Sequence, residues 1–89
     1  MEEKNIKNKF SSFLDLPKEI VLNYPLVSLV GNEDLIIYNH KGLIEYTNDT
    51  IRINTTCGIL KIEGKGMYIV KITNEYVKLS GKIKSVIYI

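Results

Sequence analysis

The chain has 89 residues, of which 45% are hydrophobic and 25% are charged, and its formal net charge is +2. This length allows at most one domain, and an intrinsically disordered chain would contain fewer apolar residues. The small net charge gives no reason to expect nucleic acid as a partner. The charge is unevenly distributed, since residues 1–49 carry five lysines against eight acidic residues. Residues 50–89 carry six lysines and Arg52 against Glu63 and Glu75, an excess of positive charge that could mark a basic face of the sheet.

The first 24 residues are predicted to form a helical segment of their own. Their apolar side chains recur at the spacing of one face of a short amphipathic helix. These side chains are Ile6, Phe10, Phe13 and Leu14. The expected organisation is therefore an N-terminal helical segment over residues 1–24, followed by a β domain over residues 25–89.

From residue 26 onward apolar and polar residues alternate, as they do in strands with one buried face. The gaps between these runs are too short for crossover helices, so neighbouring strands should pair antiparallel. Gly64-Lys65-Gly66 and Gly81-Lys82 are predicted to be two of the turns. The predicted strands are 26–30, 34–39, 43–47, 50–55, 58–63, 67–73, 75–80 and 82–89.

Short strands of this kind must fold face to face, or close on themselves, to cover their apolar faces. We predict a two-sheet antiparallel β-sandwich with a short N-terminal helical segment. A small β-barrel or a short β-solenoid is the alternative, because even strand spacing does not distinguish these architectures.

The last predicted strand is apolar on both faces, since Val86 and Tyr88 alternate with Ile87 and Ile89. A strand of this type is normally central or covered. We expect it to be buried within the domain, and pairing with a partner or with another copy of the chain is the alternative.

Asn39-His40-Lys41-Gly42 is predicted to be a hairpin corner in which Gly42 has a positive φ. The functional alternative is that His40 activates Cys57 as a nucleophile. No acidic or amide residue is placed to orient the imidazole, and no glycine-rich element marks an oxyanion site. We therefore expect His40 to be structural or solvated, and Cys57 to pack as a small hydrophobe.

A single cysteine cannot form an internal disulfide, and one histidine leaves no zinc-binding set. These features indicate an intracellular protein without a cofactor or a metal. No signal peptide follows Met1, and no apolar run approaches the roughly 20 residues of a membrane-spanning helix. We expect no direct membrane span.

The order and spacing of the corner residues resemble the YabP/YqfC family of bacterial sporulation proteins, and its YqfC branch in particular. The resemblance covers roughly residues 13–89. It is carried by Asp15-Leu16-Pro17, Pro25, Gly31, Asn39-His40-Lys41-Gly42, Gly58, Gly64 and the closing run Gly81-Lys82-Ile83-Lys84-Ser85-Val86.

The resemblance implies a non-enzymatic protein of the mother-cell cytoplasm that is needed for normal development of the spore envelope and coat. It implies a role as a protein-interaction module with a membrane-anchored partner of the YqfD type, which would hold the protein at the forespore outer membrane. Self-association stays open. It implies no catalytic, cofactor-binding or metal-binding residues. The alternative function is a small-ligand-binding or hydrolytic protein that uses His40 and Cys57.

Overall fold

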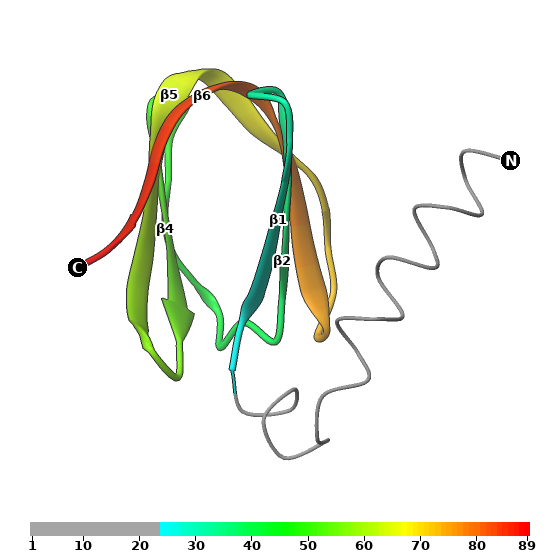
Figure 1. Ribbon diagram of the computed structural model, residues 1–89, viewed down its shortest axis with the longest axis vertical. Coiled ribbons are helices and arrows are strands. Elements are labelled where there is room, and N and C mark those ends of the chain that lie inside the picture. Colours follow the sequence, from blue (N-terminus) through cyan, green and yellow to red (C-terminus); the bar gives the residue numbers. More distant parts are fainter. Residues whose placement is uncertain (1–23) are drawn as a thin grey trace, which may run out of the picture.

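The computed structural model describes residues 24–89, in which six strands form one antiparallel sheet (Figure 1). The order of the strands across the sheet is β1-β2-β6-β5-β4-β3. The strands are β1 (Leu26–Val30), β2 (Asp34–Tyr38), β3 (Leu43–Tyr46), β4 (Thr50–Thr55), β5 (Gly58–Ile72) and β6 (Tyr76–Tyr88). The predicted helical segment lies outside the described residues, apart from Tyr24.

The two longest strands, β5 and β6, run through a sharp bend that brings the two halves of the sheet face to face (Figure 1). We call these halves limb A and limb B. Limb A contains β3, β4, residues 58–63 of β5 and residues 85–88 of β6. Limb B contains residues 68–72 of β5, residues 76–80 of β6, β2 and β1.

The predicted sandwich of two separate sheets is therefore wrong, because the two layers are limbs of one continuous sheet. The segments predicted to be turns, 64–66 and 81–82, are the bends of β5 and β6. A glycine that bends a strand and a glycine that ends one look alike in the sequence. The barrel and solenoid alternatives fail as well, since the antiparallel sheet is open, with β1 and β3 as its end strands.

Glycine is required at the bend because the backbones of β5 and β6 come very close to each other there. A Cβ atom on Gly64 would lie 2.1 Å from the carbonyl oxygen of Lys82, and one on Gly81 would lie 2.6 Å from the Cα atom of Met67. The ladder between the two strands also shifts register at Glu63/Gly64 and again at Lys65/Tyr68. Irregularities of this kind bend a strand and increase its twist, so both strands turn the corner together.

The hydrophobic core lies between the limbs and is built by alternate residues of the strands. The alternation predicted for β4, β5 and β6 is confirmed, since the inward side chains of each are almost completely buried. The outward side chains of limb A are mostly polar, and they include an ion pair between Arg52 and Glu45 at 2.7 Å. The core consists of Leu35, Ile37, Ile51, Ile53, Leu60, Ile62, Met67, Val77, Leu79 and Ile83.

Candidate functional site

The two limbs are joined by hydrogen bonds along one side of the molecule. The backbone N–H of Ile69 in limb B donates to the hydroxyl of Tyr46 in limb A at 3.0 Å. At the upper end of this side, the N–H of Met67 donates to the carbonyl oxygen of Asn48 at 2.9 Å. These bonds occupy part of the edge that β5 presents in limb B.

The opposite side, which we call the open side, is bounded by β1 in limb B and by residues 84–88 of β6 in limb A. β2 pairs with β6 only as far as Ser80. The loop between β1 and β2 then covers the start of the bend, because the carbonyl oxygens of Glu33 and Asn32 accept hydrogen bonds from the N–H groups of Gly81 and Ile83. Beyond Ile83, β6 pairs with β5 and with no other strand of the described residues.

The free edge of β6 carries backbone groups that point toward solvent. The N–H of Ile89 donates to the carbonyl oxygen of Ile59 at 2.8 Å, which identifies this pair as a hydrogen-bonded pair of the ladder. Bonded and non-bonded pairs alternate between antiparallel strands, so Ile87 and Ser85 also bond to β5. The N–H and C=O groups of Val86 and Tyr88 therefore face the open side.

Apolar side chains surround this free edge. Ile87, on the outer face of limb A, is 47% exposed, and Tyr88, on the inner face, is 48% exposed. Across the open side, Leu29 of β1 pairs with the buried Leu35 and therefore points inward, as Leu35 does. Leu29 is nevertheless 49% exposed. The last predicted strand is thus buried on one side only: Val86 packs against the core, while the strand has a free edge in limb A.

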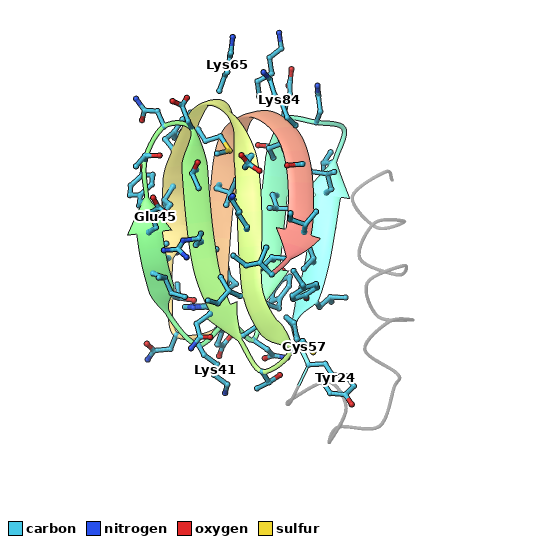
Figure 2. The ribbon with its side chains drawn as sticks, turned by 90° about the vertical axis from the view of Figure 1, so that its left-hand side faces the viewer. Tyr24, Lys41, Glu45, Cys57, Lys65 and Lys84 are labelled. Carbon is cyan, nitrogen blue, oxygen red and sulfur yellow. The ribbon has the colours of Figure 1, made fainter. Side chains whose placement is uncertain are left out.

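Three lysines lie at the bend next to the free edge. Lys65 and Lys82 stand directly opposite each other in the ladder, an arrangement that is unfavourable for like charges. Figure 2 shows Lys65 and Lys84 extending from the top of the bend. The ion pairs among residues 24–89 involve none of these three side chains. The free edge therefore begins at a cluster of positive charge that forms no ion pair within the described part of the chain, although Lys82 also lines a hollow with Glu33 and Asp34.

The other edge in limb A is protected in ways typical of sheet edges. β3 has only four residues, it carries the charged side chain of Glu45, and its pairing with β4 is irregular between Leu43 and Glu45. The edge of β5 in limb B has a register shift between Ile69 and Lys71, in addition to the bond from Tyr46. The pairing of β6 with β5 is irregular at Lys84, but residues 85–88 of β6 have neither a bulge nor a covering loop within the described part of the chain.

His40 lies in the segment that leads from β2 in limb B to β3 in limb A. The predicted hairpin is wrong, because β2 pairs with β1 and β6 whereas β3 pairs with β4. The positive φ predicted for Gly42 is confirmed at 117°. The backbone N–H of Gly42 donates to Nδ1 of His40 at 3.1 Å, and Nε2 donates to the carbonyl oxygen of Thr73 at 2.6 Å. Both ring nitrogens thus hold backbone groups together, which leaves neither free to activate a thiol.

Cys57 lies in the tight turn between β4 and β5, where its side chain is exposed, so the prediction that it packs as a small hydrophobe is wrong. Burial raises the pKa of the Tyr88 hydroxyl, and the charge of Cys57 adds to this rise. The turn that contains Cys57 lies near the end of β6, since a Cβ atom on the adjacent Gly58 would lie 3.5 Å from the carbonyl oxygen of Ile89. The structure does not bring it together with His40 as a nucleophile and base.

One hollow of about 360 Å³ lies on the outer face beside the bend. Two of its polar groups bond to each other, since the hydroxyl of Ser80 donates to the carboxylate of Asp34. Neither His40 nor Cys57 lines it, so it offers no support for a ligand site built on those two residues. Its lining consists of Glu33, Asp34, Tyr68, Ser80, Gly81 and Lys82.

Residues 24–89 contain no group of three or more histidine, cysteine or acidic side chains that could hold a metal ion. In the same part of the chain, no helix has the length and apolar character needed to cross a membrane.

Comparison with known proteins places these features in a family. A family model described as the YabP family matches residues 23–89. The uncharacterized protein YqfC of Bacillus subtilis (strain 168) is 29% identical over 87 residues, which cover 93% of this chain and 94% of that protein. The match confirms the resemblance that the corner residues indicate.

Proposed function

This chain belongs to the YabP/YqfC family, and on that premise we propose that it is a non-enzymatic sporulation protein that acts as a protein-interaction module in the mother cell. Its partner is a membrane-anchored sporulation protein of the YqfD type, and the contact holds the module at the forespore outer membrane. In this role the protein supports normal development of the spore envelope and coat.

The observation that carries the proposal is the free edge of β6. An edge with unpaired backbone groups beside exposed apolar side chains is a template for another strand. Ile87 and Tyr88 are both about half exposed on this edge, on opposite faces of the strand. Proteins commonly use such an edge to bind an extended segment, in which the main chain supplies hydrogen bonds and alternate side chains supply specificity.

Fractionation of sporulating cells tests this function. A tagged wild-type chain is expected in the membrane fraction of mother cells, and it should co-purify with a membrane-anchored protein after detergent extraction. Ile87→Lys places a charge on the free edge and should release the protein from membranes, whereas the matched substitution Lys61→Ala on the neighbouring strand should not. A wild-type chain that stays entirely in the soluble fraction would contradict the proposed function.

A further inference from the structure

The shape of the open side determines which kind of strand fits there. In Figure 2 the end of β6 is the red arrow in the front layer, and β1, in cyan, lies farther to the right in the layer behind it. By strand order, limb A ends at β6, whereas limb B continues past β6 with β2 and β1. A strand added next to β6 would extend limb A over the inner face of these outer strands of limb B, where Leu29 of β1 is 49% exposed.

This arrangement favours a single strand over a second copy of the whole chain. Two identical edges pair antiparallel about a two-fold axis perpendicular to the sheet, which keeps the inner faces of both copies on the same side. Each copy would then extend its own β1 into the space behind the other copy's β6. That space is already occupied by β1 of the first copy, so the two limbs B would overlap.

The charge at the bend determines the composition of the added strand, and the antiparallel pairing of all six strands favours an antiparallel direction for it. An antiparallel strand that pairs with residues 84–88 has its C-terminal end beside the bend. Lys65, Lys82 and Lys84 lie there without an ion-pair partner among the described residues. Acidic side chains at that end of the strand would relieve the repulsion between Lys65 and Lys82.

We propose that the open side binds one extended segment of a partner protein, antiparallel to residues 84–88 of β6, with apolar side chains directed toward Leu29 and Tyr88 and with acidic residues at its C-terminal end. This inference rests on the proposed role as an interaction module. It adds the strand that is recognised, its direction and its charge.

A synthetic peptide provides the probe. It alternates valine with threonine and ends in two glutamates, and its control carries lysines in place of the glutamates. With the full chain, the glutamate peptide should shift the amide signals of residues 84–88 and of Leu29 in nuclear magnetic resonance spectra. The lysine peptide should bind about fivefold more weakly, because two exposed ion pairs are lost. In the double variant Lys82→Glu/Lys84→Glu this preference should reverse.

Proline substitutions test the backbone pairing. Val86→Pro and Tyr88→Pro remove N–H groups that face the open side, so both variants should fold and bind the peptide at least tenfold more weakly. Ile87→Pro is the matched control, because it removes an N–H that bonds to β5 and should instead unfold limb A. A peptide N-methylated at alternate residues needs no protein variant, and it should also fail to bind.

Three results would overturn the proposal: peptide shifts confined to other elements, unchanged affinity in a folded Val86→Pro variant, or a wild-type dimer at low concentration that pairs through residues 84–88. Its failure is distinguishable from failure of the proposed function. If the membrane partner co-purifies equally with wild type and with folded Val86→Pro, the proposed function is supported and the proposed pairing with β6 is wrong. If no membrane protein co-purifies with wild type, the proposed function fails whatever the peptide does.

Discussion

The imidazole of His40 donates a hydrogen bond to the carbonyl oxygen of Thr73, which lies 33 positions away in the sequence. This contact joins the segment that crosses between the limbs to the turn between β5 and β6. The N–H of Gly42 holds the ring from its other nitrogen. His40 is therefore a cross-link of the backbone at the end of the molecule opposite the bend.

Replacing His40 by alanine should lower the free energy of unfolding by about 1–2 kcal/mol, because two partly buried hydrogen bonds are lost. The matched control is Lys41→Ala, since that side chain is exposed in the same loop and its loss should change stability by no more than about 0.5 kcal/mol. Urea denaturation of the purified variants measures both values. Equal, small effects would show that the His40 bonds contribute nothing to the fold.

Gly64→Ala should destabilise the fold by about 3 kcal/mol or more, because the new Cβ atom would overlap the carbonyl oxygen of Lys82 and force the two strands apart. Gly66 offers a close comparison, since it has a φ of +60° but nothing within 4 Å of its Cβ position. Gly66→Ala should cost only about 1–2 kcal/mol of backbone strain. Thermal unfolding of the two variants should reproduce this order, and a reversed order would contradict the close approach at the bend.

Hydrogen exchange should alternate along the free edge of β6. The amides of Ser85 and Ile87 are bonded to β5 and should exchange slowly, whereas those of Val86 and Tyr88 face the open side and should exchange rapidly in dilute protein. Residue-resolved exchange measurements give the pattern directly. Uniform protection from residue 85 to residue 88 would mean that another strand already covers this edge.

The Tyr88 hydroxyl should ionise at a higher pH than its ordinary pKa of 10.0, because burial raises its pKa and Cys57 adds to the rise. The folded protein thus favours the neutral phenol. The resulting contribution to stability is complete below the unfolded pKa and is lost as the pH rises through the folded pKa. Spectroscopic titration of tyrosinate should show the shift, Tyr88→Phe should remove it, and Cys57→Ser should reduce it. A shift that survives in Tyr88→Phe belongs to another tyrosine.

The parts of the fold that sequence reasoning predicts are those set by neighbouring residues. Ile51 and Ile53 alternate with polar residues, and this two-residue period by itself assigns them to the core. The bend at Gly64 could not be told from a turn, since the difference depends on Lys82 in a strand far along the sequence. The hairpin that the sequence predicts at His40 is wrong for the same reason, because β2 pairs with β6 and not with β3.

The candidate site was partly predictable as well. The alternation of Val86 and Tyr88 with Ile87 and Ile89 correctly indicates a strand with two apolar faces. Which side of that strand stays unpaired depends on where β2 stops, at Ser80, and on the loop that covers Gly81 and Ile83. Contacts between distant segments of this kind leave no periodic signal in the sequence.

The continuity of β5 and β6 through the bend has a consequence for the order of folding. Their ladder is nested around one turn, from Ile72↔Val77 next to the turn to Leu60↔Tyr88 at its far end. Pairing that zips outward from this turn closes only a short loop at each step, so the entropy lost per contact stays small. Two independent sheets must instead find their relative position by collision after each has formed. In this chain the β5–β6 ladder that aligns the two strands also fixes how limb A lies upon limb B.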